Sequence, residues 1–183
     1  VTVGRALWPV VQARTVGGTT VINSAICVRT PDDIFEQWKR ERGVDGLRAR
    51  MLAAQDRIER ELFVAEVPLP SRGRSNLLAQ AGAEALGFPE SHVMRRYVKD
   101  CAGAGQCLQG CRGRRKQSTN LNYVPETVAR GGVVVSCAPV DRVLFERSRA
   151  IGVTGRFVHP TTRVEGTRFR VFAKKAVVVA VSA

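Results

Sequence analysis

Residues 13–23 read Ala13-Arg14-Thr15-Val16-Gly17-Gly18-Thr19-Thr20-Val21-Ile22-Asn23, a pair of glycines followed at once by small hydroxyl residues. Adjacent glycines let the backbone approach a ligand closely, and the hydroxyl residues after them offer donors to a phosphate or to the polar edge of a ring. The same composition is also typical of a tight turn before a helix. Taken alone, the stretch leaves a ligand-binding turn and a plain structural turn both open.

Helical patterns follow this turn, and strand patterns follow the helices. Residues 5–13, which lead into the turn, form a short apolar stretch that favours extended backbone. A cap at Thr30, a first helical position at Pro31 and two aspartates after it predict a helix that ends near Gly43. We expect further helices at residues 47–62, 75–87 and 125–130, and strands at residues 133–136, 140–146, 151–158, 168–174 and 176–181. Residues 92–100 fit neither pattern clearly.

The last predicted strand differs in character from the strands before it. Residues 176–181 belong to an apolar run that continues to Ala183, and continuous apolar strands are typical of the inside of a parallel sheet. The strands before it predict an antiparallel meander instead. Because domains rarely end on a core strand and the chain opens without methionine, we expect a fragment of a longer protein.

Composition narrows the class of protein. The chain has 183 residues and a mass of 20.0 kDa, with 44% hydrophobic and 25% charged residues, which excludes a disordered or collagen-like chain. Its 29 basic and 16 acidic residues give a net charge of +13, and such an excess attracts phosphates, nucleic acid or anionic membranes. The arginines are spread along the whole chain, so no single basic patch is predicted.

The sequence also bears on compartment. Its longest apolar run, residues 176–183, is far shorter than the roughly 20 residues of a transmembrane helix, and no signal-peptide pattern opens the chain. Five cysteines, three of them within residues 101–111, do not form the pattern of a secreted disulfide framework. We therefore expect a reducing, cytoplasmic compartment and no membrane span.

Residues 13–23 resemble the first signature of the glucose–methanol–choline (GMC) family of FAD-dependent oxidoreductases. Cys27 and Thr30 depart from that signature, which has an aromatic residue or alanine at the first of these positions and a small residue or proline at the second. Further landmarks of the family are resembled, in the same order, by residues 107–118, 123–125, 131–132, 140–143 and 177–180. The resemblance implies a mixed α/β (α+β) chain, a fragment of an FAD/NAD(P)-binding-type flavoprotein fold with helices followed by a β-meander and one core strand.

The same resemblance implies a division of the chain and a set of cofactor contacts. Residues 1–183 would be part of an FAD-binding domain, with residues 44–118 as a helical and cysteine-loop insertion and residues 119–183 as a meander that returns to the flavin. The residues implied as flavin or pyrophosphate contacts are Gly17, Gly18, Thr19, Asn23, Ser24 and Ile26, and Val140 is implied to lie against the adenine.

The function that the resemblance implies is oxidation of an alcohol or other small hydroxyl compound, with hydride passed to FAD. The electron acceptor, which could be oxygen, a quinone or a cytochrome, stays open. The family's opening Gly-x-Gly-x-x-Gly turn and its catalytic histidine are expected outside residues 1–183, because neither His92 nor His159 matches the histidine's position. We therefore expect no catalytic residue in this chain, which by itself would be inactive.

Three cysteines, Cys101, Cys107 and Cys111, have the spacing Cys-x5-Cys-x3-Cys in a glycine-rich loop. Close-set thiols on such a loop could converge on one metal, although three thiolates leave a tetrahedral zinc one ligand short. Some sugar dehydrogenases of the resembled family carry an iron–sulfur cluster on a similar arrangement, which makes a cluster here a second hypothesis. Free thiols in a loop that covers the flavin domain are the simpler interpretation.

A non-enzymatic alternative is a basic module that binds nucleic acid. Residues 112–116 are rich in arginine, and Tyr123 or Trp38 would stack on bases. Aromatic residues are only 6% of the chain and none lies within the basic run, so a solvated loop face is the better interpretation of residues 112–116. Nucleic acid is therefore not the partner that we expect.

Overall fold

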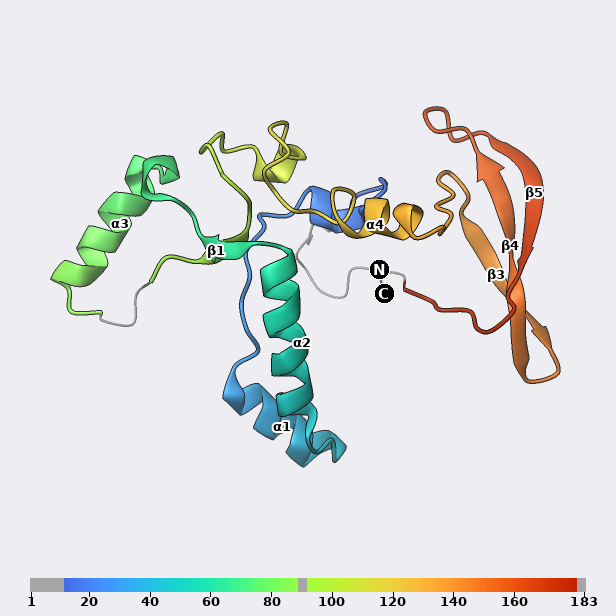
Figure 1. The fold of residues 1–183 in the computed structure, drawn as a ribbon, viewed down its shortest axis with the longest axis horizontal. Coiled ribbons are helices and arrows are strands. Elements are labelled where there is room, and N and C mark those ends of the chain that lie inside the picture. The colour runs from blue at the N-terminus through green and yellow to red at the C-terminus, as the bar shows by residue number, and fades with distance from the viewer. Residues whose placement is uncertain (1–11, 89–91, 181–183) are drawn as a thin grey trace, which may run out of the picture. The chain divides into compact units, whose positions relative to one another are not determined.

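The computed structural model describes residues 12–88 and 92–180 of the chain (Figure 1). The chain divides into two compact units, Val1–Gly132 and Val133–Ala183. Most of the extended stretch predicted at residues 5–13 lies outside the described residues. The mixed helix and strand content expected from the sequence is confirmed.

The first unit holds all the helices of the described chain. Predicted helices at residues 30–43, 47–62, 75–87 and 125–130 are confirmed, with small differences at their ends. In order, the elements are the 3-10 helix η1 (Gly18–Val21), α1 (Asp32–Arg42), α2 (Leu47–Glu61), β1 (Val64–Glu66), η2 (Leu69–Ser71), α3 (Arg74–Ala85), β2 (Arg95–Tyr97), η3 (Cys107–Gln109) and α4 (Tyr123–Ala129).

The start of α1 differs from the prediction by one residue. Pro31 is extended (φ −61°, ψ 153°) and takes the N-cap position itself, so Thr30 does not cap the helix. Asp32 and Asp33 then lie in the first turn, where their charges favour the positive end of the helix dipole. Gly43 closes the helix in a left-handed conformation (φ 63°), which glycine adopts without strain.

A small antiparallel ladder forms the core of the first unit. Strand β2 pairs with β1 in the register Val64↔Tyr97, and Tyr97 N–H donates to the carbonyl of Ala25 at 3.0 Å on its other side. Ala25, Val64, Tyr97 and Val98 make up the buried apolar cluster. The ambiguous residues 92–100 therefore contain a short strand that lies between residues 25–27 and β1.

One carboxylate ties the helical part of this unit to the ladder. Glu59 of α2 is 8% exposed and accepts bonds from Arg29 (2.7 Å) and from Arg95 of β2 (2.7 Å). Hydrogen bonds from Arg29 lower the pKa of Glu59 most, and Arg95 adds to the effect. The carboxylate is therefore ionised at neutral pH, and it joins α2 to β2 at Arg95 and to the segment that holds Arg29.

The second unit is a three-stranded antiparallel meander. Strands β3 (Val140–Glu146), β4 (Arg149–Val158) and β5 (Glu165–Phe172) pair in the order β3-β4-β5 (Figure 1). The three predicted strands at residues 140–146, 151–158 and 168–174 are confirmed in place and direction. The unit begins after α4, so residues 119–132, which the sequence grouped with the meander, lie in the first unit.

Two predicted strands are not formed in the described residues. Residues 133–136 and 176–180 have no strand pairing, and Val133 and Val178 are 84% and 85% exposed. β-Branched residues favour extended backbone, but a strand forms only where a neighbouring strand shares its hydrogen bonds. The meander pairs only within itself, so the predicted core strand is wrong for the described residues.

The helices of the described residues are also informative about membranes. None of those in residues 12–88 and 92–180 combines the length and the apolar character needed to cross a bilayer.

Candidate functional site

The glycine turn is closed by hydroxyl groups from two distant parts of the chain. Gly17, with φ 97°, precedes η1, and its carbonyl accepts from Thr20 Oγ1 at 2.5 Å and from Thr119 Oγ1 at 3.0 Å. Thr119 N–H also donates to Thr20 Oγ1 at 3.2 Å. The segment just before α4 therefore fixes the backbone of the turn at Gly17.

Gly18 leaves space on the outside of the turn. Its φ is +56°, and a Cβ built on it meets no atom within 4 Å. Thr19, the next residue, is exposed, while its carbonyl accepts from the N–H groups of Ile22 (3.1 Å) and Asn23 (3.0 Å). The turn thus has a rigid inner side and an open outer side at Gly18 and Thr19.

Asn23 has its side chain engaged within the protein. Its Oδ1 accepts from Ala25 N–H at 3.0 Å and from the Tyr97 hydroxyl. Burial raises the pKa of Tyr97, so its hydroxyl stays protonated and acts as the donor. A contact between Asn23 and a cofactor therefore falls to its Nδ2 group, which can only donate.

Lys116 lies beneath the same turn. It is fully buried (0% exposed), and its Nζ donates to the carbonyls of Val21 (2.6 Å), Asn23 (2.8 Å) and Cys107 (2.6 Å). Burial lowers the pKa of Lys116. The three carbonyls match the three N–H donors of an ammonium group, so the turn and the cysteine loop meet at one cation.

The remaining predicted contacts lie in different places. Ile26 is 43% exposed and forms an isolated bridge with Arg96, and Ser24 is half-buried between Asn23 and the core. Six predicted contacts therefore fall within one segment, residues 17–26. Val140 opens β3 in the other unit, where it is 52% exposed.

The cysteines do not form a metal centre in the described part of the chain. No group of three or more His, Cys, Asp or Glu side chains there is arranged to hold a metal ion, and all five cysteines are free. Cys101 and Cys107 line a cavity, whereas Cys111 Sγ accepts from the backbone N–H of Lys116 at 3.3 Å. The predicted metal or iron–sulfur site at Cys101, Cys107 and Cys111 is therefore not supported by this geometry.

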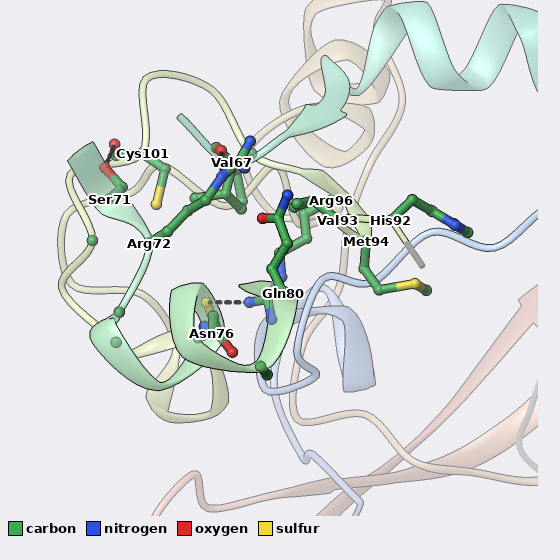
Figure 2. A pocket seen from close by; sticks show the side chains of 16 residues that line it. Val67, Ser71, Arg72, Asn76, Gln80, His92, Val93, Met94, Arg96 and Cys101 are labelled. Carbon is green, nitrogen blue, oxygen red and sulfur yellow. Dashed lines mark hydrogen bonds between the residues drawn. The ribbon is translucent and has the colours of Figure 1, made fainter. Parts of the chain in front are cut away.

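That cavity, of about 560 Å³, is lined by η2, α3, the β2 segment and the cysteine loop (Figure 2). Arg72 and Arg96 both line it, and none of the described residues in the lining carries a carboxylate. Arg72 is paired with Glu66 at 3.0 Å, while Arg96 donates to Cys107 Sγ at 3.8 Å. The cavity therefore has two arginines in a mostly apolar lining, and the charge of one of them, Arg72, is already balanced by Glu66.

The basic run at residues 112–116 is not a continuous exposed face. Arg112, Arg114 and Arg115 are exposed, but the Lys116 ammonium is buried under the turn. The run therefore offers fewer cations to a phosphate backbone than the sequence implies, which weakens the nucleic-acid alternative.

Sequence reasoning missed the residues that hold the turn from below. Lys116, Tyr97 and Thr119 contact the turn from positions 74 to 102 residues away along the chain. The scarcity of lysine could have pointed to Lys116, because only five of the 29 basic residues are lysines. A lysine within an arginine-rich run is the residue to question first, since lysine loses its charge more readily on burial than arginine.

Comparisons with known proteins show the family to which the chain is similar. A family model described as GMC oxidoreductase matches residues 1–183. A GMC-type oxidoreductase of Mycobacterium tuberculosis is 36% identical over 185 residues, which cover 98% of this chain and 28% of the relative. The long-chain-alcohol oxidase FAO1 of Arabidopsis thaliana is 26% identical (81% of this chain, 21% of the relative). An oxygen-dependent choline dehydrogenase of Pseudomonas syringae pv. tomato is 27% identical (84% and 29%). The chain thus spans less than a third of the length of these relatives.

Proposed function

The chain belongs to the GMC oxidoreductase family, and on that basis we propose that its turn at residues 17–26 binds FAD in an enzyme that oxidises hydroxyl compounds. Relatives named as a long-chain-alcohol oxidase and a choline dehydrogenase support a small-molecule alcohol as the substrate. The cytoplasmic location stays a prediction.

The open side of Gly18 is the observation that carries the proposal. A glycine in the left-handed region with no neighbour within 4 Å of a Cβ lets a ligand reach the backbone itself. Thr19 presents a hydroxyl beside that space, and its own carbonyl is already bonded inside the turn. The residues present therefore fit a phosphate-bearing or ring-bearing cofactor.

Bound FAD would supply the hydride acceptor for oxidation of the alcohol. The residues of this chain bind and orient it: the Gly18 backbone gives close approach, the Thr19 hydroxyl donates, and the Asn23 amide group donates from the end of the turn. Ser24 and Ile26 are proposed as further flavin or pyrophosphate contacts, and Val140 is proposed as the adenine contact. None of these side chains is a base suited to removing the alcohol proton at neutral pH, so we assign no catalytic residue here.

Gly18→Asn tests this assignment. Asparagine tolerates a positive φ better than other residues with side chains, so the substitution keeps the backbone and fills the open space. We expect the dissociation constant of FAD, measured by flavin fluorescence in the protein that carries this chain, to rise at least about tenfold. The melting temperature is expected to change little.

A matched control is Gly43→Asn, at the end of α1, where φ is +63° and a Cβ likewise meets nothing within 4 Å. This variant is expected to bind FAD as the unaltered protein does. Equal FAD affinity in the Gly18→Asn variant would show that FAD does not approach the turn at Gly18, and the proposal would fail.

A further inference from the structure

Lys116 is a buried cation without a carboxylate partner. Its residue is 0% exposed, and none of the ion pairs among the described residues includes it. A buried charge is costly unless hydrogen bonds compensate it. Here the compensation comes from three backbone carbonyls at 2.6, 2.8 and 2.6 Å.

Those carbonyls belong to two separate pieces of backbone. Val21 is the last residue of η1 and Asn23 ends the turn, whereas Cys107 begins η3 in the cysteine loop. All three carbonyls converge on one Nζ atom. A single side chain therefore links the backbone of the turn to the backbone of the cysteine loop.

The other end of Lys116 is anchored to the core. Its backbone N–H donates to Cys111 Sγ at 3.3 Å, and the residue forms an isolated antiparallel bridge with Val98, which is 7% exposed. The bridge continues the line of strand β2. The backbone of Lys116 therefore pairs with the buried ladder, while its side chain reaches the carbonyls of the turn.

The same side chain also reaches the cavity. Cys107 lines the cavity, and its carbonyl accepts from Lys116. Arg96, which bridges Ile26 of the turn segment, lines the cavity as well. One wall of the cavity is therefore linked to the backbone of the turn through Lys116.

We propose that Lys116 is a positioning residue. It fixes the carbonyls of Val21 and Asn23, so that the outer side of the turn is preformed for the cofactor. It also holds Cys107, on the wall of the cavity, in a fixed position relative to the turn. The cofactor part of this inference rests on the proposed function. The turn part does not, because it concerns only this chain.

The test uses Lys116→Met, which keeps most of the side-chain length and removes the ammonium. Without the cation, three carbonyls lose their donor, so the turn should open more often. Hydrogen exchange of the chain without FAD is expected to become at least about tenfold faster at the amides of Gly18, Ile22 and Asn23. Exchange in strands β3, β4 and β5 is expected to stay unchanged.

Arg115→Met is the matched control, since it removes one positive charge from the preceding, exposed position. It is expected to leave exchange in the turn unchanged. If Lys116→Met unfolds the whole first unit, protection from hydrogen exchange in β1 and β2 disappears too. In that case Lys116→Gln, which keeps two donors, is the decisive variant. Turn exchange in the folded Lys116→Met or Lys116→Gln variant equal to that of Arg115→Met would overturn the inference.

A second readout separates this inference from the proposed function. In the protein that carries this chain, Lys116→Met is expected to raise the FAD dissociation constant about tenfold and to blur the fine structure of the bound flavin spectrum. Faster exchange in the turn together with unchanged FAD binding would contradict the cofactor role of the turn. Unchanged exchange in the turn would contradict the positioning role of Lys116, whatever happens to FAD.

Discussion

Replacement of Gly17 by alanine is expected to abolish retention of FAD by the protein that carries this chain. The added Cβ would lie 2.9 Å from Val21 Cγ2 and 3.0 Å from both Cβ and N of Asn120. Real Cβ contacts are almost never that short, and φ +97° adds backbone strain of about 1–3 kcal/mol for any residue but glycine. The turn must move away from residues 119–120, and the open side at Gly18 moves with it.

The expected loss of FAD affinity is at least about a hundredfold, measured by flavin fluorescence. Gly131→Ala is the matched control, because Gly131 has φ +82° and no atom within 4 Å of a Cβ. That variant bears a similar backbone penalty without the close contacts, so it should retain FAD. If both alanine variants hold FAD equally well, the geometry of the turn at Gly17 does not govern cofactor binding.

Replacement of Gly155 by alanine is expected to destabilise the meander by about 3 kcal/mol. The added Cβ would lie 2.0 Å from the carbonyl oxygen of Pro139 and 2.7 Å from the ring of Phe169. Gly155 pairs with Val140 on one side and Phe169 on the other, so neither neighbouring strand can withdraw without breaking a ladder. The unfolding free energy from urea titration, followed by circular dichroism, measures the effect.

Gly166→Ala in β5 provides the comparison for Gly155. A Cβ there would meet only the carbonyl oxygen of Phe157, at an ordinary 3.5 Å. We expect its unfolding free energy to stay within about 1 kcal/mol of the unaltered chain. Equal unfolding curves for the two variants would mean that β3 and β5 do not approach β4 as closely as described.

The helices and the meander were predictable because their signals are local. Pro31 with two aspartates starts α1 and Gly43 ends it, and β-branched residues between turn residues mark β3 to β5. The ladder of β1 and β2 has no such signal, since Arg95-Arg96-Tyr97 is a strand only through its partners at residues 25–27 and 64–66. The run at residues 176–180 is the opposite case. Its residues favour a strand, but no neighbouring strand pairs with them, and no strand forms there.

The candidate site divides in the same way. Gly17, Gly18 and Thr19 could be proposed as cofactor contacts from the sequence, because the chemistry of a close-approach turn lies in consecutive residues. The residues that hold the turn in place could not be predicted in this way. Lys116 bonds to backbone carbonyls, which every residue type has, so no sequence pattern identifies its partners. The cysteine spacing alone did not decide whether Cys101, Cys107 and Cys111 converge, because glycines that would let three thiols come together equally allow other loop conformations.

Hydrogen exchange with and without FAD, in the protein that carries this chain, tests the central claim most directly. Saturating FAD is expected to slow exchange at residues 15–26, with the change centred on Gly18 and Thr19. FAD that binds tightly while exchange at residues 15–26 stays the same would contradict the account, because the glycine turn would then not be the part of this chain that holds the flavin.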